Sequence, residues 1–485
     1  MDKITNIMGK VRGSRFAYEY KDYILSFIFY RYLSDKQQKL QNMKEDITQD
    51  EIKSELGYYI DEKYTWNNII SKIEDKNIKT TTDDYKEVFE NFKKEVQDTI
   101  YDEIFNYINF DNIEFRENPI DNEIGILDEI TLIINEVDFE NPDKSIGEIF
   151  EECIEQLGLQ GRIGEFYTPC EISDLLAEIV TCNIKDKNQS FNIYDPTVGS
   201  ASLLHKVGQK HGGSNIKYFG QEINYNTYNM ACMNMLINDI KPDNIKLNHA
   251  DTLEDDWPCY IDYDGVNQPY TFDAVISNPT YSMRWNNKER SDDPRFSGYE
   301  RLPPKSDYAF ILHSLYHLNE TGTMAIVLPE GVLFRGLNER NIRKTLIDEN
   351  YLDCVIRLPE NLLYYTRISV VVLVFKKNKS NSDVLFIDAI NEYESFRGGN
   401  KLTSIDKIIN TYKNRCDIDE FSHLATVDEI RENEYNLNLP RYVDTFEGMP
   451  PVDIDDFLNE IEDIEEEIKE IDAKLEEYNK QLNLF

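Results

Sequence analysis

Apolar residues recur at helical spacing through the first 150 residues of the chain. The pattern is clearest over 15–40, where YKDYILSFIFYRYL (20–33) is the most apolar run. It continues through two charged, glycine-poor stretches, 82–110 and 121–137. Apolar positions three and four residues apart form one face of an amphipathic helix. The pattern therefore predicts an N-terminal helical domain over 1–150, and because that region carries no catalytic motif we expect it to serve recognition or assembly.

From about residue 160 the pattern changes to short β-rich runs separated by helical stretches. The predicted strands are 191–195, 216–223, 245–251, 272–278, 323–329, 352–359 and 368–377. Strands that alternate with helices are typical of a parallel, doubly wound α/β sheet. Such a sheet binds ligands at the carboxyl ends of its strands. We therefore expect a Rossmann-like α/β domain over 151–446.

The last segment, 447–485, carries a third pattern. Its apolar residues are spaced alternately four and three apart, and most other positions are Glu, Asp or Lys. The apolar positions are Phe457, Ile461, Ile464, Ile468, Ile471, Leu475, Tyr478 and Leu482. A helix packed on its own domain is one reading, but a 4-3 seam that runs to the terminus favours a coiled coil with a partner.

Charge and cysteine content narrow the class of protein. The formal net charge of −39 excludes non-specific binding of nucleic acid through the overall field, so a DNA-handling role needs a local basic patch or a partner. The seven cysteines show no CxxC and no zinc-ligand spacing, which is typical of free thiols in a reducing cytoplasm. The run 20–33 carries charges and is too short to span a bilayer, and no signal-peptide pattern is present. A soluble cytoplasmic protein is expected.

Polar residues close the first three β-rich runs of the predicted sheet. Asp195 ends the first run, and Gly199 lies in the turn that follows, where a glycine lets backbone approach a ligand closely. Glu222 ends the second run, at the position that commonly holds the two hydroxyls of a ribose. Asp251 ends the third and could accept a hydrogen bond from an adenine amino group. Together they describe a pocket for an adenosine-bearing cofactor with few phosphate contacts, since neither GxGxxG nor a P-loop is present.

The fourth run ends in SNPTY (277–281), a motif suited to methylation of an exocyclic amine. The amine of adenine is a poor nucleophile because its lone pair is delocalised into the ring. Two acceptors, the side-chain carbonyl of Asn278 and the main-chain carbonyl of Pro279, could hold its protons and draw the nitrogen toward sp³ geometry. Tyr281 could stack on a base flipped out of the duplex. Catalysis would then consist of positioning and electrostatic stabilisation, with no strong general base.

These motifs, in this order, resemble the modification (methyltransferase) subunit of type I restriction–modification systems. The resemblance extends from about residue 20 to 446. The matching stretches are GEFYTP (164–169), DPTVGSASLL (195–204), FGQEINYNTYNMACMNM (219–235), NHADTLEDDWP (248–258), FDAVISNPTYS (272–282), SDYAFILHSLYHLNETGTMAIVLPEGVLFRG (306–336) and YNLNLPRYVDTF (435–446). The set is far more specific than SNPTY alone, which several amino methyltransferases share.

The resemblance implies S-adenosylmethionine as cofactor and adenine-N6 methylation of double-stranded DNA as activity. It places the methionine end of the cofactor against Asp195 and two short segments. The first segment is Glu165, Phe166, Tyr167, Thr168, Pro169 and Cys170, and the second is Gly199, Ser200, Ala201 and Ser202. It also implies a complex of two copies of this chain with a specificity subunit, contacted through the C-terminal helix, and a restriction subunit. Sequence readout by another chain would explain the acidity.

One loop is locally basic despite the acidity of the chain. RWNNKERSDDPRFSGYERLPPK (284–305) follows the SNPTY strand directly and interleaves cations with aromatic residues. Its cations are Arg284, Lys288, Arg290, Arg295, Arg301 and Lys305. The loop could grip the DNA backbone around the flipped base. The alternative is a solvated loop of mixed charge, because Glu289, Asp292 and Asp293 dilute it.

Another pair of residues suggests a metal only superficially. His313 and His317 are four residues apart, but no HExxH accompanies them, so we expect structural roles and no metal.

Departures from the family pattern keep other functions open. Thr280 stands where the family usually has a second proline, and glycine is usual at one or both of Ala201 and Ser202. We expect Ser202 to be harmless if its backbone is helical, and a left-handed conformation to cost about 1–2 kcal/mol. The alternatives are an assembly subunit that binds the cofactor with impaired catalysis and, less favoured, a protein or RNA amino methyltransferase.

Overall fold

The computed structural model describes most of the chain. The described residues are 20–44, 46–75, 77–110, 125–139, 144–160, 168–288, 290, 292–299, 301–363, 368–396, 399–444, 468, 469, 471 and 474. The chain divides into two units, 1–443 and 444–485. The predicted heptad helix falls almost wholly outside the described residues and stays a prediction. Among the described residues, no helix combines the length and apolarity that crossing a membrane requires.

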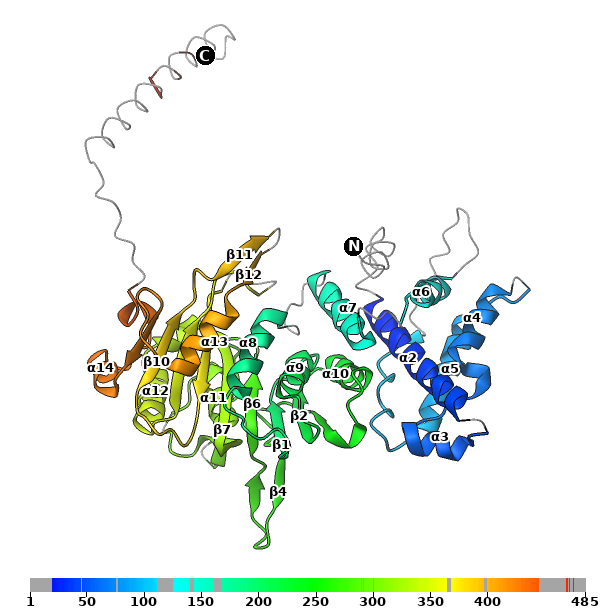
Figure 1. Ribbon diagram of the computed structural model, residues 1–485, viewed down its shortest axis with the longest axis horizontal. Coiled ribbons are helices and arrows are strands. Elements are labelled where there is room, and N and C mark those ends of the chain that lie inside the picture. Colours follow the sequence, from blue (N-terminus) through cyan, green and yellow to red (C-terminus); the bar gives the residue numbers. More distant parts are fainter. Residues whose placement is uncertain are drawn as a thin grey trace. The chain divides into compact units, whose positions relative to one another are not determined.

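The N-terminal region is helical, as the apolar spacing predicts (Figure 1). Its helices are α2 (Lys21–Met43), α3 (Gln49–Leu56), α4 (Trp66–Glu74), α5 (Thr82–Glu95), α6 (Ile126–Asn135) and α7 (Ile146–Gln160). An aromatic core holds them together, in which the ring of Phe27 stacks on Tyr85 at 5.4 Å. The predicted stretch 82–110 is helical only to Glu95, because Val96 already leaves helical geometry. The hydroxyl of Tyr32 on α2 donates to Asp239, just after α10 (Tyr225–Ile237), which joins these helices to the sheet domain.

A nine-stranded sheet forms the centre of the second region (Figure 1). Its order is β13-β10-β8-β9-β7-β6-β1-β2-β3. The strands are β1 (Phe191–Asp195), β2 (Ile216–Glu222), β3 (Ile245–His249), β6 (Phe272–Ser277), β7 (Leu318–Pro329), β8 (Leu352–Arg357), β9 (Val370–Phe375), β10 (Val384–Asp388) and β13 (Ser422–Ala425). Two hairpins, β4 (Cys259–Ile261) with β5 (Asn267–Pro269) and β11 (Tyr393–Phe396) with β12 (Gly399–Leu402), stand apart from it.

The sheet is mostly parallel, with two exceptions. β9 pairs antiparallel with both β7 and β8, and β13 pairs antiparallel with β10. The predicted strand 368–377 therefore departs from the expected parallel direction, whereas the predicted doubly wound α/β class is confirmed. β7 and β8 are connected through α12 (Asn338–Asp348), whereas β8 leads to β9 with no helix in the described residues between them. A strand that is antiparallel to its predecessor needs no long crossover connection. β9 can therefore follow β8 directly and lie between β7 and β8, antiparallel to both.

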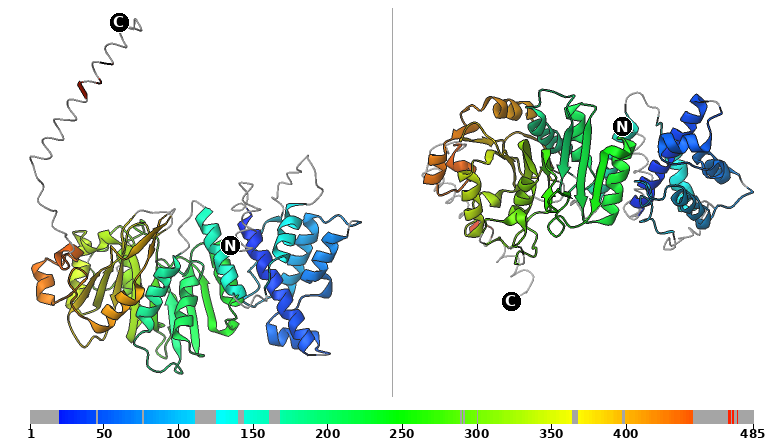
Figure 2. Two further views of the ribbon diagram at one scale, coloured as in Figure 1. Left: turned by 45° about the horizontal axis from the view of Figure 1, so that its top comes forward. Right: turned by 90° about the horizontal axis from the view of Figure 1, so that it is seen from below.

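Helices cover both faces of the sheet, as the two views of Figure 2 show. One face packs against α8 (Cys170–Thr181), α9 (Ser202–His211), α10 (Tyr225–Ile237) and α13 (Ile405–Asn414). The other packs against α11 (Asp307–Tyr316) and α12, with α14 (Val427–Glu432) near the edge. Alternate residues of β1 serve the two cores, since Ile193 faces the first and Tyr194 the second. Burial on both faces explains why these strands read as short continuous apolar runs.

Candidate active site

The predicted polar strand ends lie together on one edge of the sheet. β3, β2, β1 and β6 are consecutive neighbours and run parallel, so Asp251, Glu222, Asp195 and Asn278 follow their carboxyl ends side by side. A carboxylate oxygen of Glu222 accepts from the main-chain N–H of Gly199 at 3.1 Å, which joins the second strand end to the turn after the first. The fold thus assembles the sequence-predicted constellation.

Two of these carboxyls are buried, and burial dominates their protonation. Asp195 is 1% exposed, and burial, opposed by hydrogen bonds from Thr197 and assisted by the charge of Glu222, raises its pKa to about 7. Burial also raises the pKa of Glu222, although main-chain N–H groups of Asn224 and Gly199 donate to it. Buried carboxyls with raised pKa values are suited to a ligand that brings hydroxyl donors or positive charge.

The turn after β1 uses left-handed backbone at two positions. Gly199 has φ +54° and Ala201 has φ +62°, whereas Ser202 begins α9 with helical backbone. Ser202 is therefore harmless, as expected, and the left-handed cost of about 1–2 kcal/mol lies at Ala201. The side-chain amide of Asn234 on α10 donates to the main-chain oxygen of Ser200 at 2.9 Å and holds the turn against the helix.

Asn278 is held by two hydroxyl groups, one on each side of its amide. Its Nδ2 donates to Thr168 Oγ1 at 3.0 Å, and its Oδ1 accepts from the Tyr281 hydroxyl at 2.5 Å. Burial, together with the nearby Asp307 carboxylate, raises the pKa of Tyr281 well above its usual value, so the phenol remains a neutral donor. The Asn278 oxygen expected to accept a hydrogen bond from the target amine thus already accepts one from the phenol. The side chain of Thr280, between Pro279 and Tyr281, is exposed.

Asp307 is a functional candidate that sequence reasoning did not single out. It is fully buried, and its carboxylate accepts from Ser282 N at 2.7 Å and from Ser282 Oγ at 3.2 Å. Ser282 directly follows the SNPTY motif and has φ +54°. Arg335, from the segment after β7, donates to both Asp307 and Ser282 Oγ. This network fixes the turn that carries Tyr281, and the only signal in the sequence was a carboxylate at the start of an apolar helix.

The predicted DNA-contact residues fall into two groups. Arg284, Lys288 and Arg301 are exposed, and Lys305 is half-buried with its ammonium near Ser282 Oγ. Arg290 is also half-buried and pairs with Glu254.

Arg295 requires a correction, because it is 4% exposed. Its guanidinium donates to the main-chain oxygens of Thr252 and Leu253 and pairs with Asp293. Thr252 and Leu253 come from a segment distant in sequence, which charge patterning could not reveal. Arg295 therefore braces the fold, and we do not retain it as a DNA contact.

His313 and His317 are buried beside Asp256, with ligand atoms within 4.8 Å of one another. Both ring nitrogens of His313 have partners, Tyr194 Oη at 2.8 Å and Arg295 Nη1 at 3.1 Å. Burial, with the charges of His317 and Arg295, lowers the pKa of His313 well below its usual value. A guanidinium in this position competes with any cation, which supports the structural role expected from the sequence.

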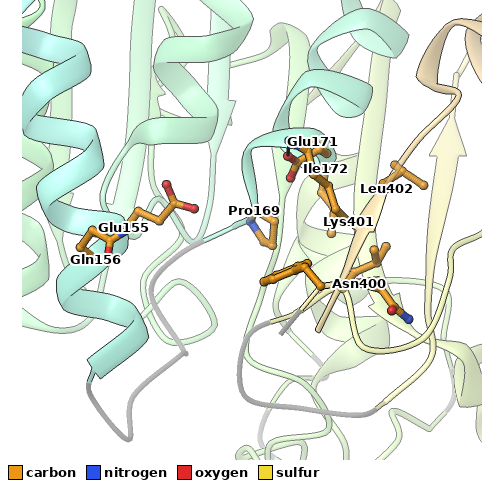
Figure 3. Close-up of a pocket in the computed structure, with 10 residues that line it drawn as sticks. Glu155, Gln156, Pro169, Glu171, Ile172, Asn400, Lys401 and Leu402 are labelled. Atoms are coloured by element: carbon orange, nitrogen blue, oxygen red, sulfur yellow. Dashed lines mark ion pairs between the residues drawn. The ribbon is translucent and has the colours of Figure 1, made fainter. Parts of the chain in front are cut away.

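A pocket of about 300 Å³ opens beside the start of α8 (Figure 3). Lys401 on β12 pairs with Glu171 on α8 across it at 3.1 Å. Of the predicted cofactor residues that the structure describes, only Pro169 lines it. Cys170 is exposed at the first position of α8, and Glu165, Phe166 and Tyr167 lie outside the described residues.

Comparison with known proteins identifies the family of the chain. Residues 141–449 match the N-6 DNA methylase model, and residues 1–122 match the HsdM N-terminal domain model. The type I restriction enzyme MpnII methylase subunit of Mycoplasma pneumoniae is 33% identical over 91% of this chain and 89% of its own length.

Solved structures agree as well. The crystal structure of the methyltransferase subunit of a type I restriction–modification system from Streptococcus thermophilus has a TM-score of 0.83 and 35% identity, over 92% of this chain and 98% of that one. A structure from a study of type I complex assembly shares the fold at a TM-score of 0.63 and 18% identity, over 98% and 97% of the two chains. The chain belongs to the N-6 DNA methylase family and is a methylase subunit of the type I restriction–modification class.

Proposed function

We propose that this subunit transfers a methyl group from S-adenosylmethionine to the N6 amine of an adenine flipped out of double-stranded DNA. The observation that carries the proposal is the position of Asn278 and Pro279 at the end of β6. The neighbouring strand β1 ends in Asp195, and Glu222 and Asp251 lie at the ends of the next two strands along the same edge. A cofactor pocket and a pair of amine acceptors on neighbouring strand ends put a methyl donor and its acceptor in contact, which is the main requirement of this chemistry.

The residues present suit the cofactor. Glu222 would accept from the two ribose hydroxyls, Asp251 would accept from the adenine amine, and Asp195 would face the methionine end. Buried carboxyls with raised pKa values gain a partner when such a ligand arrives. Left-handed backbone at Gly199 and Ala201 keeps the turn close to the ligand. S-adenosylmethionine supplies the electrophilic methyl group when bound.

The chain's own groups would act on the target amine. The Asn278 side-chain oxygen and the Pro279 carbonyl would accept hydrogen bonds from its two N–H groups and favour sp³ geometry at nitrogen. Tyr281 would leave the Asn278 oxygen and stack on the base. The amine would lose its proton after the methyl group arrives, so no strong base has to be supplied. These steps are positioning and electrostatic stabilisation.

We further propose that the chain acts in the bacterial cytoplasm within a complex of two methylase subunits, one specificity subunit and restriction subunits. The described part of the chain has its exposed basic loop next to the candidate site, whereas the whole chain carries a net charge of −39. A separate subunit that reads the DNA sequence fits this charge distribution. The heptad segment 447–485 is the proposed contact with that subunit.

One observation favours a second candidate, an assembly subunit that binds the cofactor without efficient catalysis. Ala201 adopts left-handed backbone without being glycine, and Thr280 replaces the usual proline. Co-expression with the specificity subunit in a host free of adenine methylation distinguishes the two functions. Single-molecule sequencing of host DNA should reveal a modified motif. Cofactor binding in calorimetry without any modified motif would favour the assembly subunit and contradict the main proposal.

A further inference from the structure

The loop between β7 and α12 exposes large apolar side chains on the catalytic edge of the sheet. Leu337 is 88% exposed and Phe334 is 47% exposed. The position between them is open as well, since a Cβ added at Gly336 would meet no atom within 4 Å. Leu337 also has φ +55° with ψ −125°, a sparsely populated backbone conformation that costs about 1–3 kcal/mol. Within the described fold, the cost of this backbone conformation is not offset by burial of the Leu337 side chain.

This loop is tied to the catalytic turn by Arg335. The guanidinium donates to Ser282 Oγ at 3.2 Å and to Asp307 at 2.5 Å, and it pairs with Glu339 at the start of α12 at 2.9 Å. Glu339 and Asp307 are both buried. Arg335 therefore links the loop to two buried carboxylates, one on α12 and one beside the catalytic turn. β7 is the parallel neighbour of β6, with Ser277 in register with Ile326, so the segment that follows β7 leaves the sheet at the same edge as Asn278.

A third exposed apolar side chain lies on the catalytic turn, next to the Ser282 that Arg335 contacts. Met283 follows Ser282, is 37% exposed, and is held by the hydrogen bond from Ser306 N to its main-chain oxygen. Arg284, next in sequence, is exposed, and the Lys305 ammonium lies 3.3 Å from Ser282 Oγ. Apolar side chains flanked by cations match a duplex, whose stacked bases are apolar and whose edges carry phosphates.

We infer that the loop 334–337 is the wedge that opens the DNA duplex, with Leu337 at its tip and Phe334 and Met283 beside it. This inference rests on the proposed function, because only a flipped base leaves a gap to fill. Extruding a base costs a few kcal/mol of lost stacking and pairing. An apolar side chain inserted into the gap replaces part of the lost stacking, and Arg335 couples that insertion to the turn that carries Tyr281.

The test uses the complex with its specificity subunit and duplexes that carry the motif found by sequencing. One duplex has the target adenine paired with thymine, and the other has it opposite an abasic site, which lowers the cost of flipping. Leu337→Ala should lower kcat/KM by roughly 10-fold on the paired duplex, about 1.4 kcal/mol, and by less than about 2-fold on the abasic duplex. Ile261→Ala is the matched control, because Ile261 is 75% exposed on the separate β4–β5 hairpin.

The outcomes separate this inference from the proposed function. Methylation of both duplexes by the unsubstituted complex tests the proposed function alone. An equal loss on both duplexes with Leu337→Ala, or loss of the specificity subunit in size-exclusion chromatography, would assign the loop to a protein contact and overturn the wedge. No loss on either duplex would also overturn it. Fluorescence of 2-aminopurine at the target position should fall in Leu337→Ala and stay unchanged in Ile261→Ala.

Discussion

The hydroxyl of Tyr281 donates a hydrogen bond to the side-chain oxygen of Asn278, with 2.5 Å between the two oxygens. The side chain expected to stack on the target base thus occupies the acceptor expected to hold the target amine. Under the proposed function, an adenine amine bound at this oxygen would either replace the phenol or share the oxygen with it, because an amide oxygen has two lone pairs.

Removing only that hydroxyl should favour DNA binding. In Tyr281→Phe the ring remains for stacking, while the Asn278 oxygen loses its hydrogen bond from the phenol. That hydrogen bond contributes about 0.5–1.5 kcal/mol. Because DNA binding no longer has to compete with it, we expect KM for DNA to fall by roughly 2–10-fold. Tyr281→Ala removes the ring as well and should lower kcat/KM by roughly 10-fold or more. Steady-state kinetics with saturating cofactor measure both. A rise of KM in Tyr281→Phe would show that the phenol contributes a contact to DNA instead.

Thr168 should act as a positioning residue for Asn278. Its hydroxyl accepts from the Asn278 amide nitrogen and thereby turns the amide oxygen toward the substrate. Thr168→Val removes the acceptor at nearly constant volume and should lower kcat by roughly 2–10-fold, while KM for the cofactor changes little. Thr168→Ser keeps the hydroxyl and is the matched control. If Thr168→Val raised KM for S-adenosylmethionine and left kcat unchanged, Thr168 would belong to the cofactor site alone.

The left-handed backbone at Ala201 predicts opposite effects of glycine at two adjacent positions. Ala201→Gly removes a cost of about 1–2 kcal/mol but adds about 0.4–1 kcal/mol of unfolded-chain entropy, so the protein should gain up to about 1.6 kcal/mol. Ser202→Gly places glycine in helical backbone and should lose up to about 1 kcal/mol. Urea denaturation of both variants measures the difference. Equal destabilisation by the two substitutions would contradict the assigned conformations.

Asp195 predicts a pH dependence of stability. Folding raises its pKa from 3.8 to about 7, so above pH 3.8 the folded state binds more protons than the unfolded state. The free energy of unfolding should therefore decrease as the pH rises toward 7 and level off above that, as far as this group is concerned. Denaturation of the unliganded protein between pH 5 and 8, compared with Asp195→Asn, isolates the effect. A difference between the two proteins that is independent of pH would show that Asp195 is ionised throughout.

The sequence predicted the parts of the site that follow from strand ends. Apolar runs that stop at Asp195, Glu222 and Asn278 define where strands end, and parallel neighbours bring those ends to one edge. It did not predict contacts between segments far apart in the chain. The burial of Arg295 depends on carbonyls of Thr252 and Leu253, which lie more than forty residues away.

The same limit applies to the direction of β9 and to the role of Asp307. A run of valines is equally compatible with either strand direction, because direction is decided by the connection and the neighbouring strands. In the sequence, Asp307 is an ordinary carboxylate at the start of a helix. Its role in holding the turn depends on hydrogen bonds from Ser282 and Arg335, which are distant in sequence. Local pattern determines element type and ends, and tertiary contacts determine which polar groups are available for chemistry.

The most direct test of the account is transfer of a labelled methyl group in vitro. The purified complex with its specificity subunit is incubated with a duplex carrying its motif and with S-adenosylmethionine labelled in the methyl group, and the DNA is digested to nucleosides for mass spectrometry. We predict label in N6-methyldeoxyadenosine for the unsubstituted protein. Asn278→Ala should give none while calorimetry shows that it still binds the cofactor. Label on another nucleoside, or methylation that persists in Asn278→Ala, would contradict the account.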